Sequence, residues 1–160
     1  MKIWIVLCTL VMLLTGCGAQ ETFETVQDIM PVEPVASPQQ FFVNLPEDTA
    51  APTFQDGDRE ELYVCRDYCI SKQILDGGDL QKTLMSVTGK DQSELELLKT
   101  RAENWDRYDF VWTTAGEAGD RLGRAVILDD GEYHYCMSVL RNPGDSQVTW
   151  KSVFGSFSLS

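Results

Sequence analysis

Hydrophobic and polar residues alternate along the second half of the chain, which is the pattern of strands with one buried face. The alternation is cleanest over residues 108–114, where an aromatic side chain stands at alternate positions. Residues 121–128 and 132–141 are rich in β-branched and aromatic side chains, and Asp130-Gly131 lies between them. An Asp-Gly pair between two such runs predicts a β-hairpin.

Two further stretches predict strands. Residues 61–75 are rich in tyrosine, valine, isoleucine and cysteine and are bounded by glycine turns, and Arg66-Asp67 would turn this stretch into a hairpin. Residues 95–102 predict a weaker strand, because leucines are opposed by charged residues there. A helix beginning at Ser93 is the alternative for this stretch.

Helical spacing occurs twice. Residues 80–87 place leucine and valine on one face, with Asp79 as the N-terminal cap and Gly89 as the C-terminal stop. Near the end of the chain, apolar residues fall at i, i+3, i+4 and i+7, and Asp145 or Ser146 would cap that helix. These apolar residues are Trp150, Val153, Phe154 and Phe157. The order of elements predicts a single α+β domain, an antiparallel sheet with a short first helix and an aromatic-faced C-terminal helix.

Proline marks the segment before this domain. Five of the six prolines lie within residues 18–53, where they oppose both helix and central strand. We therefore expect a proline-rich tether over residues 17–57 and a globular domain over residues 58–160. Four residues of the tether are more apolar than a linker requires, and docking of this patch onto the domain as an edge strand is left open. They are Phe41, Phe42, Val43 and Leu45.

The chain begins with Lys2 and an uncharged apolar run over residues 3–14, followed by Leu14-Thr15-Gly16-Cys17. A charged start, a short apolar core and small residues at a cleavage site predict a signal peptide over residues 1–16. The apolar run is shorter than the roughly 20 residues that a membrane-spanning helix needs.

Leu14-Thr15-Gly16-Cys17 resembles the lipobox of bacterial lipoproteins. The resemblance implies that Cys17 is acylated, becomes the first residue after cleavage and anchors the chain at the extracytoplasmic face of the cell membrane. A simple signal peptide with an incidental Cys17 is the alternative.

The Tyr133-His134-Tyr135 strand followed by the aromatic final helix resembles the PsbP-like or Mog1-like fold of some bacterial lipoproteins. The resemblance covers residues 61–159 and implies a sheet flanked by helices. Members of that group mostly act as binding or assembly factors, so it implies no catalytic residues.

Charge restricts the partners. The chain has 25 acidic and 13 basic residues, a net charge of −12 at pH 7, and loss of Lys2 with the signal makes it one unit more negative. Such a domain is repelled by nucleic acid and by anionic lipid headgroups, so cationic, neutral or protein partners are expected. An acidic inhibitor of a basic envelope hydrolase is one alternative function.

Three cysteines remain after cleavage and acylation, namely Cys65, Cys69 and Cys136, so at most one intramolecular disulfide can form. If Cys65 and Cys69 share one continuous strand, they lie about 13 Å apart, and a disulfide would join Cys136 to one of them. With His134, the three thiols also make a Cys₃His ligand set for zinc. We favour small core residues over a metal site and expect no cofactor. An envelope metal or thiol-redox protein is the second alternative.

No catalytic group is expected. His134 is the sole histidine, and no nucleophile signature accompanies it. The acidic cluster over residues 56–61 lacks the glycine and glutamate of a calcium loop, and Asp129 and Asp130 are explained by their turn. Gly77-Gly78 predicts a tight turn rather than an anion site.

The sequence thus predicts a monomeric, non-enzymatic binding module on a lipid anchor. Trp105, Tyr108 and Trp112 are interpreted as core rather than as a ligand groove.

Overall fold

A computed structural model describes residues 37–102, 104–117, 119–142 and 150–160. These residues belong to one compact unit, residues 36–160. The predicted signal peptide, Cys17 and the first part of the predicted tether lie outside the described residues. No helix in the described part of the chain is long and apolar enough to cross a bilayer.

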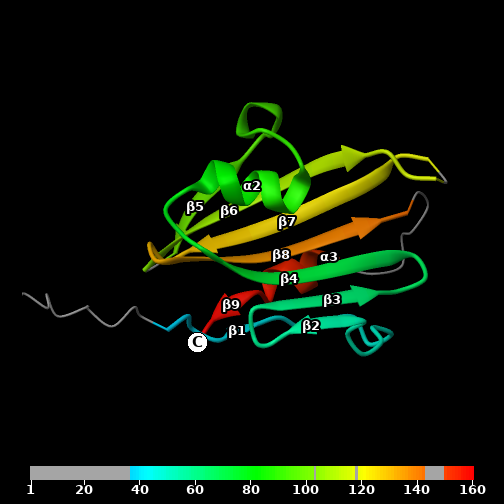
Figure 1. The fold of residues 1–160 in the computed structure, drawn as a ribbon, viewed down its shortest axis with the longest axis horizontal. Coiled ribbons are helices and arrows are strands. Elements are labelled where there is room, and N and C mark those ends of the chain that lie inside the picture. The colour runs from blue at the N-terminus through cyan, green and yellow to red at the C-terminus, as the bar shows by residue number, and fades with distance from the viewer. Residues whose placement is uncertain (1–36, 103, 118, 143–149) are drawn as a thin grey trace, which may run out of the picture. The chain divides into compact units, whose positions relative to one another are not determined.

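A seven-stranded antiparallel sheet forms the centre of the unit, in the order β2-β3-β4-β8-β7-β6-β5 (Figure 1). Its strands are β2 (Phe54–Asp56), β3 (Glu60–Val64), β4 (Tyr68–Asp76), β5 (Leu98–Ala102), β6 (Trp105–Thr114), β7 (Arg121–Asp129) and β8 (Tyr133–Arg141). A second sheet pairs β1 (Phe41–Phe42) with β9 (Ser158–Leu159). The unit is a small domain of antiparallel sheets with few helices and 47% strand, which is compatible with an α+β or a β-rich class.

Both predicted hairpins are confirmed, and local turn chemistry explains them. At Arg66-Asp67 the amide of Cys65 donates to the carbonyl of Tyr68 at 2.9 Å. At the β7–β8 turn Gly131 has φ +95°, a conformation that glycine adopts without a steric penalty. The Asp129 carboxylate accepts from the Gly131 amide at 2.9 Å and closes the same turn.

The first helix is confirmed as α2 (Leu80–Thr88). The Asp79 carboxylate accepts from the Lys82 amide at 3.0 Å, and the Gly89 amide donates to the Met85 carbonyl at 2.8 Å. Leu84 is fully buried against the sheet. The capping aspartate and the αL glycine thus satisfy backbone groups that the helix itself leaves open.

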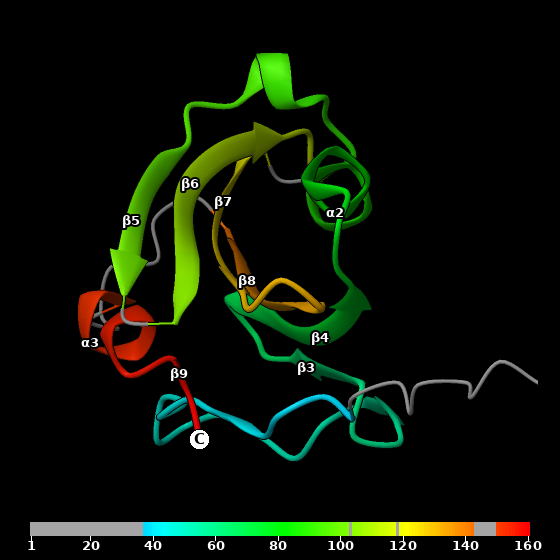
Figure 2. The same ribbon diagram turned by 90° about the vertical axis from the view of Figure 1, so that its left-hand side faces the viewer.

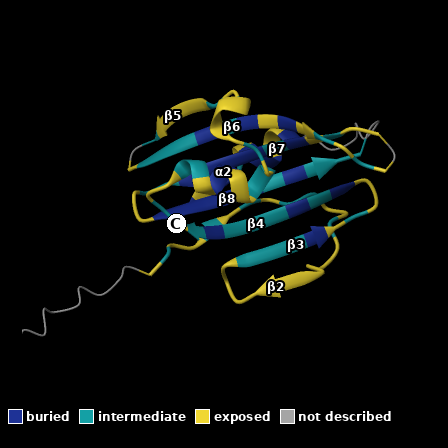
Figure 3. Ribbon diagram, turned by 45° about the horizontal axis from the view of Figure 1, so that its top comes forward, coloured by how far each residue is buried: buried dark blue, intermediate teal, exposed yellow. Residues whose placement is uncertain are grey.

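The two faces of the curved sheet carry separate cores, with α2 on one face and α3 (Trp150–Gly155) on the other (Figure 2). The α3 core takes alternate residues of β4 and β8, including Ile70 and Tyr135, together with α3 itself. The α2 core takes the opposite set, including Cys136, and adds Leu84 from α2. Buried residues concentrate in the central strands, whereas β2 and β5 at the two edges are exposed over most of their length (Figure 3).

The final helix ends earlier than predicted. It ends at Gly155, and Phe157 lies beyond it, yet Phe157 is still only 4% exposed. The Ser156 amide and hydroxyl both bond to carbonyls of the last turn, and the chain then runs into β9. The predicted stripe is therefore buried as a set, although only three of its members are helical. The predicted caps Asp145 and Ser146 lie outside the described residues.

The stretch after α2 resolves the choice between strand and helix. Gln92–Glu94 form a single 3₁₀ turn with Asp91 and Glu94 as a capping box, and β5 begins only at Leu98. The strand prediction is correct for this stretch, although its start was placed three residues too early.

The predicted tether is wrong over residues 37–57, because this segment is part of the folded unit. Phe41 and Phe42 pair with Leu159 and Ser158, and β2 pairs with β3. The cause is the apolar patch, since Phe41, Val43 and Leu45 pack against the α3 core. Docking as a strand, the option left open by the sequence, is confirmed. The domain therefore starts well before residue 58.

Candidate binding groove

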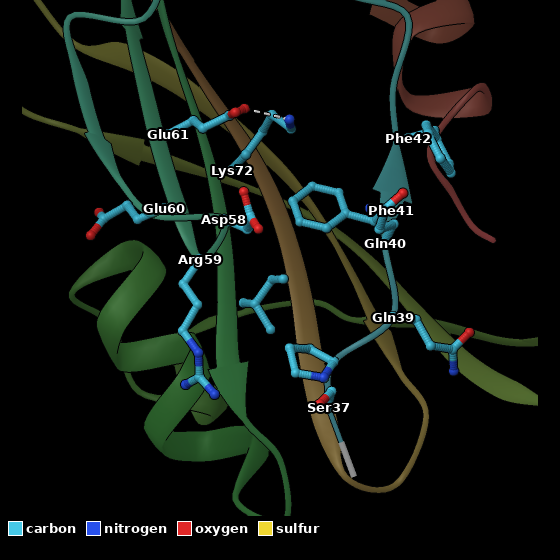
Figure 4. Close-up of a pocket in the computed structure, with 12 residues that line it drawn as sticks. Ser37, Gln39, Gln40, Phe41, Phe42, Asp58, Arg59, Glu60, Glu61 and Lys72 are labelled. Atoms are coloured by element: carbon cyan, nitrogen blue, oxygen red, sulfur yellow. Dashed lines mark hydrogen bonds and ion pairs between the residues drawn. The ribbon is translucent and has the colours of Figure 1, made fainter.

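A cavity of about 400 Å³ lies between the segment 37–42 on one side and the start of β3 with the second half of β4 on the other, and we call it the N-terminal groove (Figure 4). Its volume falls within the roughly 300–1,000 Å³ of small-molecule sites. Polar, charged and apolar side chains all line it: Ser37, Pro38, Gln39, Gln40, Phe41, Phe42, Asp58, Arg59, Glu60, Glu61, Lys72 and Ile74.

One wall of the groove is held in place by the C-terminal end of the chain. The Gln39 amide donates to the Tyr135 hydroxyl at 2.9 Å, and the Ser160 amide donates to the Gln40 carbonyl at 3.0 Å. The Phe41 ring meets the Phe157 ring edge-to-face at 5.5 Å between centroids. Because these bonds anchor the backbone at Gln39 and Gln40, directly before Phe41, the wall is part of the folded unit.

The opposite wall carries an ion pair between Lys72 and Glu61, whose side chains are 16% and 23% exposed. Glu61 also accepts from the Tyr63 hydroxyl at 2.8 Å, and the Lys72 ammonium lies 4.9 Å from the centroid of the Phe41 ring. Burial raises the pKa of Glu61, but the hydrogen bonds from Lys72 and Tyr63 outweigh burial and leave that pKa below its ordinary value. Burial, followed by the bond to Glu61, raises the pKa of Tyr63 to about 12.

Replacing Lys72 by methionine should lower the free energy of unfolding by about 1–2 kcal/mol near pH 7, because Glu61 would keep a partly buried charge without its cation. A carboxyl whose pKa is lowered by folding stabilises the folded state above its ordinary pKa, which is 4.5 here, and this contribution is lost as the pH falls through the folded-state pKa. The difference between parent and variant, measured by urea unfolding, should therefore shrink on acidification.

Arg59→Met is the matched control, since Arg59 pairs at 3.5 Å with Asp76, whose side chain is 87% exposed. This change should cost less than about 0.5 kcal/mol. An equal loss in the two variants would contradict the role given to the Lys72–Glu61 pair.

The charged side chains at the rim of the groove are more exposed than the Lys72–Glu61 pair, and not all of them have a partner. Arg59 pairs with Asp76 and also lies 5.7 Å from the centroid of the Tyr133 ring. The Glu60 carboxylate accepts from the Gln73 side chain at 2.8 Å. Within the described part of the chain no hydrogen bond or ion pair reaches the side chain of Asp58, whose carboxylate lies at the groove in Figure 4. Asp58 is thus the carboxylate on the groove that is available to a ligand.

The three cysteines are free thiols. Cys65 and Cys69 do not share a continuous strand, because the hairpin turn separates them and Cys69 pairs with Val64. Cys65 packs against the α3 core and Cys136 belongs to the α2 core, so these two lie on opposite faces of the sheet.

A disulfide between Cys69 and Cys136, the other pairing that the sequence left open, is not formed either. Cys69 pairs with Leu140 and Cys136 pairs with Gln73, which places the two cysteines four residues apart along neighbouring strands. That offset is about 13 Å, beyond the Cα separation that a disulfide allows. The thiol-redox alternative therefore gains no support from the positions of these residues.

Cys136 should be the least reactive thiol. It is 2% exposed, and burial raises its pKa far above the ordinary value, so almost no thiolate forms. In a chain that begins at residue 18, an Ellman's titration of the folded protein should miss Cys136, whereas unfolding in denaturant should expose all three thiols. Rapid native labelling of Cys136, identified by mass spectrometry, would contradict this burial.

His134 is 1% exposed, and each of its ring nitrogens lies near a polar side chain. Its Nδ1 lies 2.6 Å from the Thr83 hydroxyl, and its Nε2 lies 3.5 Å from an Asp129 carboxylate oxygen. The arrangement ties α2 to β8 and leaves substrate no path to the imidazole. Among the described residues no group of three or more histidine, cysteine or acidic side chains is placed to hold a metal, and the four residues of the predicted zinc set are not brought together.

The remaining predicted sites have structural explanations. Gly77 packs so closely that an added Cβ would lie 2.8 Å from the Glu132 carbonyl, in keeping with a tight turn. Tyr108 and Trp112 belong to the α2 core, whereas Trp105 packs against the α3 core, so the core interpretation is confirmed but on two faces. The acidic segment 56–61 spans β2, its turn and β3, and its last four members line the groove.

Sequence reasoning missed the groove. Phe41 and Lys72 stand 31 positions apart in sequence, and only the pairing of β1 with the end of the chain brings them together. The sequence feature that indicated one wall of the groove is the apolar patch around Phe41, which lies inside a proline-rich stretch.

Comparison with models of known protein families finds no match to this chain. Comparison with curated proteins also finds none. A solved structure from Bacteroides thetaiotaomicron VPI-5482 is similar, with a TM-score of 0.49 and 17% sequence identity. The match covers 75% of this chain but only 45% of that one, so this chain spans less than half of its length.

Proposed function

We propose that this protein is a non-enzymatic binding module and that the N-terminal groove is its binding site. The observation that carries the proposal is the groove itself, a cavity of about 400 Å³ with polar and apolar lining residues, a fixed wall and an Asp58 carboxylate without a partner in the described structure. Concave sites with a few convergent polar groups are where ligands bind in most proteins. The one histidine, in contrast, is closed off from solvent.

We further propose that the module is a lipoprotein held at the extracytoplasmic face of the cell membrane through Cys17. The support is the Leu14-Thr15-Gly16-Cys17 sequence after an apolar run. Because the folded unit begins at residue 36, residues 18–35 would connect the acylated cysteine to the domain. The groove is lined by residues 37–42, the first described residues of that unit.

For the fold we propose kinship with the PsbP-like or Mog1-like group. The features that support it are the central antiparallel sheet, one helix on each face and the aromatic α3 after β8. Members of that group mostly bind or assemble other molecules, in keeping with a binding role for this domain.

Two experiments test these proposals. For the anchor, cells expressing the parent or the Cys17→Ser variant are labelled with a clickable palmitate analogue, and only the parent should incorporate label. Equal labelling, or none in either, would remove the lipoprotein assignment.

For the binding site, a ¹⁵N-labelled chain beginning at residue 18 is screened by NMR against a library of small fragments. This chain retains both sheets, both helices and both cores, all of which lie within residues 37–160. Shifted amides should gather at Gln40, Asp58 and Lys72 rather than at the β6–β7 loop around Gly116, which lines another hollow of the surface. Absence of any binder at the groove, or turnover of hydrolase or redox substrates by the purified domain, would overturn the proposal.

A further inference from the structure

The chemistry of the groove points to one class of ligand. Its charged groups are largely satisfied internally, since Glu61 is paired with Lys72 and Arg59 with Asp76. Asp58 is the exception among the described lining residues. A ligand that complements this groove therefore brings a positive charge to Asp58.

The aromatic wall offers apolar surface to such a ligand. The Phe41 ring already holds the Lys72 ammonium at 4.9 Å from its centroid, so it would contact the stem of a cationic side chain rather than the charge itself. Ile74 and Pro38 add apolar surface on the same groove. An alkyl stem ending in an ammonium group matches this combination, because lysine side chains cover apolar surface with their stems and keep the charge at the rim.

The electrostatic field of the domain also favours a cationic ligand. The strands at the groove end of the sheet, β2, β3 and β4, carry four acidic residues and one basic residue, whereas β5, β6 and β7 carry five basic and three acidic residues. A cation is thus drawn to the groove end and an anion is repelled from it. At a net charge of −12 for the whole chain, this steering should weaken as salt is added.

The groove is also larger than a single ammonium group requires. It is bounded by the chain segment 37–42 on one side and by β3 and β4 on the other, and it encloses about 400 Å³ (Figure 4). A space of this volume between two backbone segments accommodates a short extended peptide as well as a small free amine, and the peptide would contact both segments.

We propose that the N-terminal groove binds a lysine-bearing peptide, with the lysine stem against Phe41 and Ile74 and its ammonium on the Asp58 carboxylate. This inference rests on the proposed binding role of the groove and names the ligand class for it.

The probe is N-acetyl-trilysine amide, titrated by NMR into the chain that begins at residue 18. The amides of Gln40, Asp58 and Lys72 should shift, and the affinity should fall with added salt. The uncharged N-acetyl-triglutamine amide and the anionic triglutamate peptide should leave them in place. Equal shifts with trilysine and triglutamine, or shifts confined to other surfaces, would overturn the proposal. Equal affinity for n-butylammonium would overturn the peptide assignment.

Two variants test the named contacts. Asp58→Asn should weaken trilysine binding by about two- to fivefold, the range for an exposed ion pair. Phe41→Leu, which keeps an apolar side chain but removes the ring, should weaken it by about two- to fivefold, because the lysine stem loses contact area with the ring. Thermal unfolding of each variant shows that it is folded before it is titrated.

Asp67→Asn is the matched control, with the same change of charge at the far end of β3, about 17 Å along the strand. It should bind trilysine as the parent does, and equal weakening by Asp58→Asn and Asp67→Asn would contradict the site. If neutral fragments bind the groove and trilysine does not, the binding role stands and the lysine inference fails. If nothing binds there, both fail.

Discussion

Phe154→Ala is expected to lower the free energy of unfolding by about 3–5 kcal/mol, the usual cost of truncating a fully buried phenylalanine. Phe154 is 1% exposed at the centre of the α3 core. Its ring is covered by the Arg124 guanidinium at 4.5 Å from the centroid, and its backbone carbonyl accepts from Arg107 at 3.0 Å. Since α3 has only six residues, it has little stability of its own and depends on this packing.

Urea unfolding followed by tryptophan fluorescence measures the effect. Leu98→Ala serves as the control, because Leu98 is 64% exposed on the edge strand β5 and its loss should cost less than about 1 kcal/mol. A loss below 1 kcal/mol in Phe154→Ala would mean that α3 does not cover the sheet. The variant should also loosen the N-terminal groove, since Phe157 and β9, which support its wall, follow directly after α3.

Gly123→Ala is expected to cost about 1–3 kcal/mol through overpacking. Gly123 pairs with Trp112 across β6 and β7, and the Trp112 ring lies directly over it, so that an added Cβ would overlap the ring atoms. Trp112 is itself 6% exposed in the α2 core and has little room to shift. The glycine is therefore required by the close approach of the ring.

Gly155→Ala is a control of the same chemistry. Nothing lies within 4 Å of a Cβ added at Gly155, and the residue ends α3. This change should be neutral or stabilise by a few tenths of a kcal/mol, because alanine restricts the unfolded chain. Thermal or urea unfolding of the two variants compares them directly, and equal losses would show that Trp112 does not require the glycine.

Much of the fold was predictable because its signals are local. Asp79 and Gly89 bracket α2, Arg66-Asp67 turns β3 into β4, and Asp130-Gly131 turns β7 into β8. Each of these signals depends only on residues that are neighbours in the sequence, so it can be recognised without knowledge of the folded structure.

The candidate site was not predictable for the opposite reason. Its walls come from residues 37–42 and from β3 and β4, and the first wall is held by Tyr135, Phe157 and Ser160. The high proline content predicted a tether over residues 37–57. The strands that form there nevertheless avoid the prolines, since Pro38, Pro46 and Pro52 all lie outside them. The relative positions of the cysteines were not predictable either, because the register between β4 and β8 is what keeps Cys69 and Cys136 apart.

By itself the sequence determined the strands β3 to β8 with their hairpin turns, the first helix and the acidic charge, and it raised the expectation of an exported chain with Cys17 as its anchor. Only the tertiary structure decided that residues 37–57 belong to the domain, that the two cores lie on opposite faces, and that a groove forms beside Phe41. The physical reason is that turn and cap signals depend on neighbouring residues, whereas the groove depends on pairing Phe41 with Leu159 at the other end of the folded unit.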